Sequence, residues 1–336
     1  MNKSSGCFQM LPVVAALTLM GCGPQGSDQG SQSTADVPVA ERPAAAPMAD
    51  AMVDQPAPSW QEAANATYRG VFDEAIVLKD GQWQGAPYVE GGASAPRAGL
   101  AGDFLLHGDV DGDGAEEAVV LLWSSSGGSG TFDYVAVLDR DVNGAVSPVA
   151  IIPLGDRVKV RSAAIEDGRI AFDVVQAGPG DAACCPGQKM RRTFVLEGEA
   201  MIETTTDDQG RMTLADLAGE WRLLQFGAEE AVPPEVQITV QFENGTIAGS
   251  AACNRYTGSV QEGDMPGQIT LSGPLALTRK MCPPPLMDWE QRYMAALEGL
   301  EQYSFLAGKL VLSWRQEDAA GSLIFVRATE GGAAVE

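Results

Sequence analysis

Hydrophobic and polar residues alternate in short stretches along most of the chain beyond residue 60. In the clearest stretch, EVQITVQFE, one side of an extended chain would carry Val236, Ile238, Val240 and Phe242. Because successive side chains of a strand point to opposite faces, this pattern predicts a strand with one buried and one solvated face. Further strands are predicted in AEEAVVLLW, TFDYVAVL, RVKVRSAAI and RIAFDVV, and Asn-Gly and Asp-Gly pairs favour hairpin turns.

The pattern changes to helical spacing in LMDWEQRYMAALEGLEQY, which follows a run of three prolines at 283–285. Hydrophobic residues recur there at intervals of three and four, on one face made of Trp289, Tyr293, Ala296, Leu297 and Leu300. This spacing predicts one amphipathic helix, and we interpret its aromatic face as core packing and not as a cofactor site. The predicted fold class is mainly β or α+β, with two β-rich domains and a helix packed on the second, antiparallel one.

The first residues carry a targeting signal. A short apolar run ends in LMGC and resembles a bacterial lipobox, which predicts a signal peptide over 1–21 and a lipidated Cys22 as the mature N-terminus. Residue 23 is glycine and not aspartate, which by resemblance to Gram-negative sorting rules indicates the outer membrane. We therefore expect a lipid-anchored protein of the cell envelope, on the periplasmic face of the outer membrane.

Composition divides the rest of the chain. Residues 22–59 are rich in Gly, Ser, Gln, Pro and Ala and predict a disordered tether. The polar run TTTDDQGRMT is interpreted as a break between two folded parts. The expected domains are a β-rich domain over 60–206 and a second domain over 207–330, followed by a tail over 331–336.

Charge excludes some partners. The formal net charge is −23, which disfavours binding to nucleic acid or to an anionic membrane surface, since both are polyanions. Contact with a membrane is expected only through the N-terminal lipid. The sequence names no protein or small-molecule partner.

The second domain resembles a known family. The segments LAGEWRLLQF, GTIAGSAACNRYTGSV, LALTRKMC and DWEQRYMAALEGLEQYSF occur in the order of a META (HslJ-like) domain. The residues that match the family motifs are Gly249, Cys253, Asn254 and Gly258 in one turn, and Thr278, Met281 and Cys282 in a second segment. The resemblance implies a compact antiparallel β structure with one packed helix.

Members of that family are largely bacterial envelope proteins with associations to stress and drug tolerance and with no established enzymatic chemistry. The expected function is therefore non-enzymatic binding or envelope maintenance. Two alternatives stay open: a protease inhibitor or binder of small hydrophobic compounds, and a thiol-dependent or hydrolytic enzyme.

The state of the cysteines bears on whether this protein is a thiol-dependent enzyme. Once Cys22 is lipidated and Cys7 is removed, Cys184, Cys185, Cys253 and Cys282 remain, with three pairings among them. A nucleophilic cysteine needs a base, and the single histidine, His107, belongs to the other domain. We expect a disulfide between Cys253 and Cys282, with reduced buried thiols as the alternative.

The adjacent pair Cys184 and Cys185 is harder to interpret. Neighbouring Cα atoms lie about 3.8 Å apart, below the usual disulfide range. The expectation is two small, partly buried residues in a turn, while a redox-sensing bridge and a cross-link between domains stay open as alternatives.

The segment DVDGDGAEE carries the sharpest chemical signal. Its oxygen donors, suited to Ca²⁺, are the carboxylates of Asp109, Asp111, Asp113 and Glu117 and the Ala115 carbonyl. Flanking stretches look like strands, and the twelfth position is Val120, so an EF-hand is excluded. The loop resembles the strand-loop-strand calcium loops of FG-GAP repeats, with Glu117 in place of their usual aspartate. A hydrated acidic turn is the alternative, and either role is structural.

Overall fold

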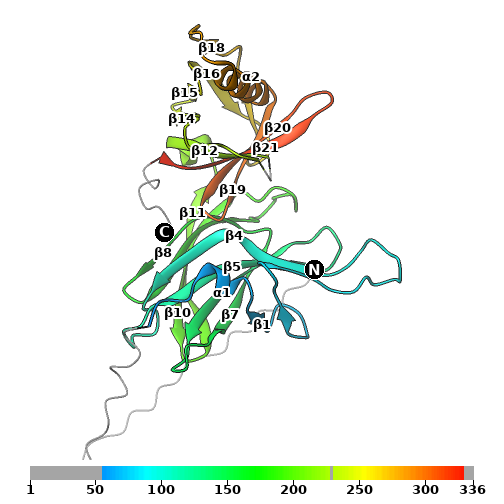
Figure 1. Cartoon of the computed structure of the whole chain (residues 1–336), viewed down its shortest axis with the longest axis vertical. Helices are drawn as coiled ribbons and strands as arrows, with labels where there is room; N and C mark the ends of the chain where they lie inside the picture. Colours follow the sequence, from blue (N-terminus) through cyan, green and yellow to red (C-terminus); the bar gives the residue numbers. More distant parts are fainter. Residues whose placement is uncertain (1–54, 228–229, 329–336) are drawn as a thin grey trace, which may run out of the picture. The chain divides into compact units, whose positions relative to one another are not determined.

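The computed structural model describes residues 55–227 and 230–328 (Figure 1). The predicted signal peptide, Cys22, nearly all of the predicted tether and the tail over 331–336 lie outside the described residues. Antiparallel strands make up most of the described chain, which confirms the predicted fold class. No helix among the described residues is both long enough and apolar enough to span a membrane.

The first half of the described chain contains two larger antiparallel sheets. The five-stranded sheet has the order β3-β4-β5-β6-β7, with bounds Gln82–Gln84, Arg97–Gly108, Glu117–Ser125, Phe132–Arg140 and Val146–Asp156. The four-stranded sheet has the order β11-β10-β9-β8, and β8 to β11 span Lys159–Glu166, Arg169–Gln176, Gln188–Glu197 and Ala200–Arg211. A short helix, α1 (Trp60–Ala63), precedes the small pair β1 (Thr67–Tyr68) and β2 (Ile76–Val77).

Strand β5 is hydrophobic without alternation because both of its faces are covered. Val119 and Leu121 belong to a core shared with Phe172 of β9 and with other residues of the four-stranded sheet. Val120 and Leu122 belong to a second core that contains residues of α1, β1 and β2. A strand buried on both sides gains from apolar residues at every position, so the run AVVLLW is explained by two cores that meet at one sheet.

The second half forms a ten-stranded antiparallel sheet. Its main order is β17-β16-β15-β14-β12-β21-β20-β19, while β13 pairs with β12 and β18 pairs with β16. Strands β12 to β16 span Gly219–Phe226, Glu230–Ala231, Thr239–Glu243, Thr246–Ala251 and Asn254–Glu262. Strands β17 to β21 span Ile269–Leu271, Ala276–Leu277, Leu300–Leu306, Lys309–Arg315 and Ala320–Arg327, and a 3-10 turn, η2 (Leu214–Leu217), precedes β12.

The predicted helix is present as α2 (Pro284–Glu298) and packs on this sheet through Tyr293, Ala296 and Leu297. It is shorter than the helical pattern, which ran on to Leu300. Gly299 is the C-cap, and Leu300 begins β19. Glycine readily ends a helix, so the last hydrophobic residue of the pattern reaches the same core from a strand.

The polar run 204–213, interpreted from sequence as a break, is mostly strand. Residues up to Arg211 continue β11, where Asp207 lies opposite Arg191 and Thr206 opposite Arg192 of β10. Opposite charges across neighbouring strands support pairing even where both strands are polar. The boundary at 206/207 therefore falls inside a strand of the first half.

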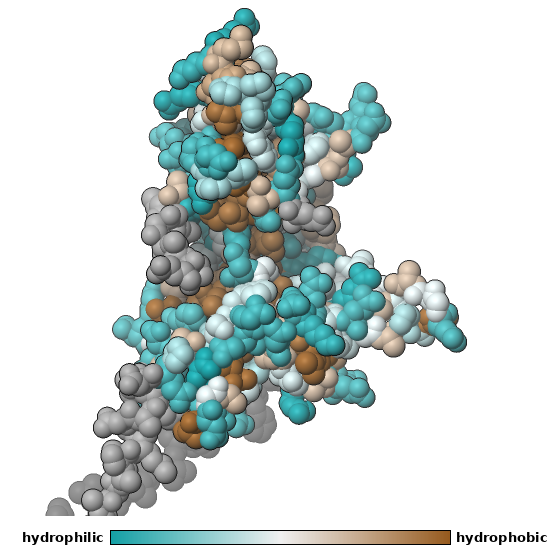
Figure 2. All heavy atoms as spheres, viewed as in Figure 1, coloured by the Kyte–Doolittle hydropathy of each residue, from teal (hydrophilic) through white to brown (hydrophobic). Residues whose placement is uncertain are grey.

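Hydrophilic side chains cover most of the face seen in Figure 2, and hydrophobic atoms appear in small separate areas. The large hydrophobic residues that are exposed are scattered, as in Tyr88, Val89, Val142 and Met281. Scattered exposed hydrophobic residues are normal for a folded protein surface.

Candidate functional site

The acidic loop joins β4 to β5 at the edge where Gly108 pairs with Glu117. The Asp109 carboxylate accepts hydrogen bonds from the backbone N–H of Gly112 at 2.6 Å and of Gly114 at 3.2 Å. Both glycines have positive φ, 85° and 91°, a conformation that other residues adopt at a cost. The glycines thus let the loop fold around the Asp109 carboxylate.

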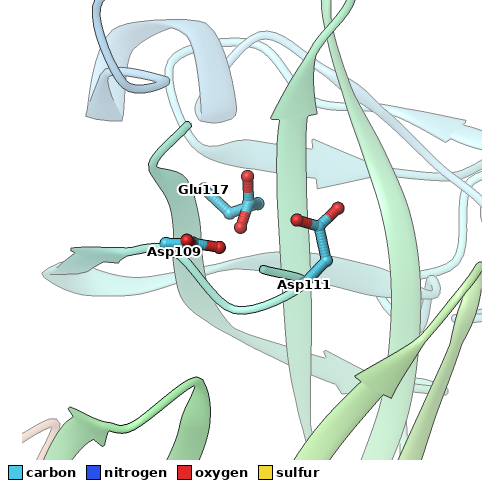
Figure 3. A group of neighbouring side chains, drawn as sticks. All are labelled: Asp109, Asp111 and Glu117. Carbon is cyan, nitrogen blue, oxygen red and sulfur yellow. The ribbon is translucent and has the colours of Figure 1, made fainter. Parts of the chain in front are cut away.

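Glu117 is the unusual residue of this loop because its side chain is fully buried, with 0% exposure. Its Oε2 accepts a hydrogen bond from the Val110 N–H at 2.8 Å, whereas its buried Oε1 has no hydrogen-bond partner among the described residues. Figure 3 shows the carboxylates of Asp109, Asp111 and Glu117 gathered around one region, and one oxygen from each lies within 4.8 Å of the others.

Burial changes the electrostatics of this cluster. The pKa of Glu117 is raised to about 7, mainly by burial and in smaller part by nearby carboxylates such as Asp111, while the hydrogen bond from Val110 lowers it. Burial also raises the pKa of Asp111. A charged carboxylate removed from water requires a compensating partner. A hard divalent cation would satisfy all three oxygens together.

The structure brings together three of the four predicted carboxylate ligands. Asp113 is outside the group, and its Oδ1 accepts a hydrogen bond from the Ala115 N–H at 2.8 Å. The gathered carboxylates are those of Asp109, Asp111 and Glu117, and the role of the Ala115 carbonyl stays a prediction. Asp109 and Asp111 also accept backbone hydrogen bonds within the loop, so this local bonding does not by itself set Asp113 apart.

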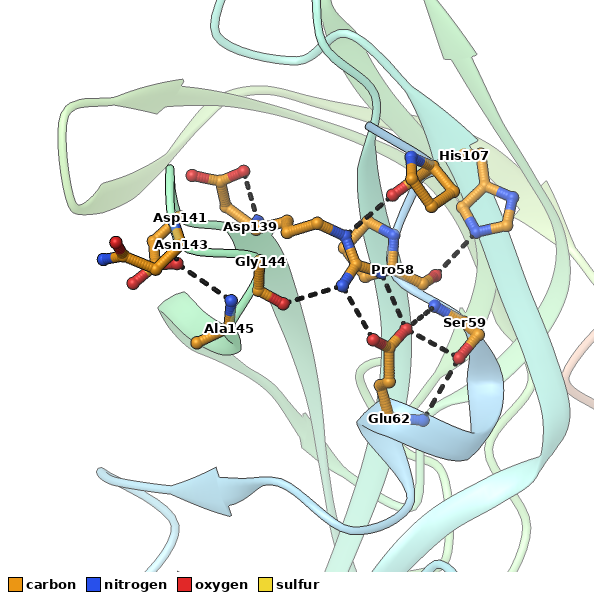
Figure 4. A network of polar contacts seen from close by, with 11 residues as sticks. Pro58, Ser59, Glu62, His107, Asp139, Asp141, Asn143, Gly144 and Ala145 are labelled. Atoms are coloured by element: carbon orange, nitrogen blue, oxygen red, sulfur yellow. Dashed lines mark hydrogen bonds and ion pairs between the residues drawn. The ribbon is translucent and has the colours of Figure 1, made fainter. Parts of the chain in front are cut away.

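A second polar network lies on the neighbouring strand ends and was not predicted (Figure 4). The Arg140 guanidinium binds both carboxylate oxygens of Glu62, at 2.8 and 2.9 Å, and donates to the Pro56 carbonyl at 2.8 Å. Ser59 and Glu62 form a capping box at the start of α1. The one sequence signal for this network was the segment SWQE, in which Ser59 and Glu62 have the spacing of a capping box. The network fastens the segment 56–62 to β6.

The single histidine is engaged close by. His107 Nε2 lies 2.9 Å from the Pro58 carbonyl oxygen (Figure 4). It is in β4 of the five-stranded sheet, whereas Cys253 precedes β16 of the ten-stranded sheet. The described residues therefore bring no histidine to Cys253.

The four described cysteines are joined in two pairs. Cys253 pairs with Cys282, with Cα atoms 6.0 Å apart, which is the pairing expected from the sequence. Cys184 pairs with its neighbour Cys185, in place of the two unlinked residues that we expected. That pair lies in a loop whose ends are held by Asp181, which accepts from the N–H groups of Gly178 and Gly187.

Asn254, beside Cys253, is buried at the centre of a hydrogen-bond network. Its Nδ2 donates to Glu290 Oε1 at 3.1 Å and to the Lys280 carbonyl at 3.2 Å. Its Oδ1 accepts from Thr278 Oγ1 at 2.8 Å and from the Lys280 N–H at 2.7 Å. All four hydrogen-bonding positions of the amide are used. Sequence reasoning missed Glu290, which lies on α2.

The remaining motif residues have packing roles. A Cβ at Gly249 would collide with the Thr239 carbonyl oxygen, to which the Tyr256 hydroxyl donates at 3.0 Å. A Cβ at Gly258 would collide with Leu275. Met281, in contrast, is 93% exposed, and nothing in the structure explains its place in the motif.

Comparison with known proteins gives a family for one part of the chain. The model of the META domain family matches residues 213–330. An NMR structure of a protein from Burkholderia xenovorans is similar, with 24% identity, coverage of 35% of this chain and 87% of that chain, and a TM-score of 0.28. The crystal structure of a DUF4847 family protein from Bacteroides vulgatus has 12% identity, coverage of 34% and 95%, and a TM-score of 0.26. No curated protein matches. Residues 213–330, which carry the CN turn, its disulfide and the packed helix, are a META domain.

Proposed function

We propose that this protein is a lipid-anchored, non-catalytic protein of the bacterial envelope whose first half is stabilised by calcium. The ion would be held by Asp109, Asp111 and Glu117. The observation that carries the proposal is the buried Glu117 Oε1, which has no hydrogen-bond partner among the described residues and faces two further carboxylates (Figure 3).

Calcium fits this site by the chemistry of its donors. The three side chains offer only carboxylate oxygens, which favour hard cations over zinc or copper. Magnesium demands a nearly ideal octahedron of ligands, whereas calcium accepts irregular loops completed by backbone oxygens and water. The affinity is expected in the range of extracellular calcium modules, with Kd of about 10⁻⁴ to 10⁻³ M.

Two contacts support a non-catalytic role. The Cys253 sulfur is bonded to Cys282 and offers no thiolate, and thiolate is the form that acts as a nucleophile. Cys253 also lies on a different sheet from His107, whose ring is engaged with the Pro58 carbonyl. The META family, moreover, has no established enzymatic activity, which supports binding or envelope maintenance over catalysis.

Lipid attachment rests on the sequence LMGC alone. In a Gram-negative host, an alkyne-labelled fatty acid should label the wild-type protein but not Cys22→Ser, and the label should fractionate with the outer membrane. Labelling of both proteins, or of neither, would remove the anchoring part of the proposal and leave the calcium part standing.

The calcium part is tested by thermal unfolding of the full chain with calcium and with a chelator. Calcium should raise the Tm of the wild-type protein, since a ligand that binds only the folded state stabilises it. Glu117→Gln should abolish the shift. Because it removes a buried charge without a partner, its Tm in chelator should be higher than that of the wild type in chelator.

The matched control is Asp141→Asn. Asp141 accepts from the N–H groups of Asn143 and Ala145 in another turn, but it does not belong to the carboxylate cluster. This variant should keep the full calcium shift. An equal Tm of the wild type with calcium and with chelator would contradict the calcium part of the proposal.

A further inference from the structure

The outer face of the ten-stranded sheet in the META domain contains a groove. It has a volume of about 730 Å³ and lies over β12, β14, β15, β16 and β18. The opposite face of these strands is the hydrophobic core, where Tyr256 meets Tyr293 of α2. The groove therefore lies on the solvent side of a sheet whose other side is already packed.

The strand register explains why the groove is hollow. Glu220 lies opposite Gln241, Gln241 opposite Ala248, and Ala248 opposite Thr257. Residues directly opposite each other share a face of the sheet, so this row crosses four strands. Ala248, on the inner strand β15 of this row, has only a methyl group as its side chain. Ser250, the next outward residue of β15, is also small, so the floor of the groove is low at its centre.

The polar groups along this row are available for a ligand. Among the described residues, the side chains of Glu220, Gln241 and Arg255 make no hydrogen bond or ion pair with the protein, and all three are exposed. Arg255 lies opposite Ser250 at the β16 end of the groove, while Glu220 lies at the β12 end. The groove thus presents a negative charge at one end, a positive charge at the other and an amide between them.

The spacing of these charges indicates the size of the ligand. Strands β12 and β16 are separated by three strand intervals, or about 14 Å, and Arg255 lies two residues along β16 from Thr257, the residue in the row of Glu220, so the diagonal span is about 16 Å. An extended peptide covers about 3.3 to 3.6 Å per residue, so about four to five residues bridge the two charges. The amino group of such a peptide would pair with Glu220, and its carboxylate would pair with Arg255. One of its backbone amides would hydrogen-bond to Gln241.

The lining also distinguishes a peptide from other ligands. The aromatic ring that lines the groove, that of Tyr256, is only 3% exposed, so it offers no face on which a sugar could stack. The polar lining is likewise unsuited to a purely hydrophobic compound. We propose that this groove binds short peptides of about four to five residues that carry a free carboxylate at Arg255. This inference does not depend on the calcium site.

The test uses tetra-alanine as the probe and backbone amide NMR spectra of the full chain as the readout. Saturable shifts are expected for amides of residues 248–250 and 255–257. Arg255→Gln should weaken binding about tenfold or more, because a hydrogen bond to a charged group is lost. Arg279→Gln, an exposed arginine outside the groove lining, is the matched control and should bind as the wild type does.

Two further measurements keep the test decisive. Tetra-alanine with an amidated C-terminus should bind the wild type about as weakly as tetra-alanine binds Arg255→Gln. Ala248→Leu should remove binding by filling the floor, while its other resonances stay in place and show that the sheet is folded.

Three results would overturn the inference. The first is the absence of saturable shifts up to the solubility limit of the peptide. The second is equal binding by the wild type and Arg255→Gln. The third is binding of a chitin tetrasaccharide to the same amides in preference to the peptide, which would assign the groove to sugars.

Discussion

Asn254 donates both its backbone N–H and its side-chain amide to the two carboxylate oxygens of Glu290, at 2.7 and 3.1 Å. The two residues are separated by 36 positions in sequence, and both are buried, with exposures of 2% and 6%. Asn254 begins β16 and Glu290 lies on α2. The pair therefore ties the helix to the turn that carries the Cys253 disulfide.

Asn254→Ala should lower the free energy of unfolding by about 2 to 4 kcal/mol, because buried hydrogen bonds to a charged group and to backbone groups are lost together. Asn254→Asp, which has nearly the same shape, should cost at least as much, since it places a second carboxylate against Glu290. Urea unfolding measures both effects. Asn143→Ala in an exposed turn is the control and should change the free energy by less than about 0.5 kcal/mol. A stable Asn254→Asp variant would show that shape and not hydrogen bonding explains the motif.

The Cys253–Cys282 disulfide spans 29 positions. Its replacement by two alanines should lower the free energy of unfolding by about 3 to 4 kcal/mol, since the unfolded chain regains the freedom of that loop. The double alanine variant of Cys184 and Cys185, a pair separated by one position, should change it far less. Guanidinium unfolding under oxidising conditions compares them. Equal losses in the two variants would contradict this account.

Gly249→Ala should destabilise the META domain by about 1 to 3 kcal/mol, as overpacking does in a filled core, because the new Cβ meets the Thr239 carbonyl. Gly273→Ala is the matched control, since nothing lies within 4 Å of a Cβ there. Its effect should stay within about 0.5 kcal/mol. Thermal unfolding of both variants decides the matter, and similar melting temperatures would show that β15 shifts without cost.

The Glu62–Arg140 pair predicts a specific pH dependence. The hydrogen bond from Arg140 lowers the pKa of Glu62 from its ordinary value of 4.5 to about 2. A carboxyl with a lowered pKa in the folded state adds stability that is present above the unfolded pKa and is lost as the pH falls through the folded pKa. The difference in stability between the wild type and Glu62→Gln should therefore shrink between pH 4.5 and about pH 2.

This difference is measured by urea unfolding of both proteins at about pH 6 and about pH 3. Because 37% of the Glu62 side chain is exposed, solvent screening keeps the effect modest. Glu74→Gln, at an exposed position, should match the wild type at both values. A difference that stays constant with pH would mean that Glu62 acts through packing and not through its charge.

Local patterns in the sequence determined the fold class, the existence of α2 and the META motifs. Strands and helices leave periods of two and of three to four in the positions of hydrophobic residues, and these periods need no knowledge of distant contacts. The turn glycines Gly144 and Gly168 were likewise predicted from their Asn-Gly and Asp-Gly pairs, since their positive φ, 85° and 70°, is a conformation that glycine adopts readily.

The tertiary structure alone decided which polar side chains are buried and which hydrogen-bond partners they have. The sequence predicted Glu117 as a ligand but not its burial, which arises because it pairs with Gly108 at the start of a strand covered on both faces. Glu290 looked like a polar residue of an amphipathic helix, and only the packing of α2 against β16 makes it the partner of Asn254. A residue's type and spacing are local properties, whereas the water it loses and the partner it gains depend on segments brought together by folding.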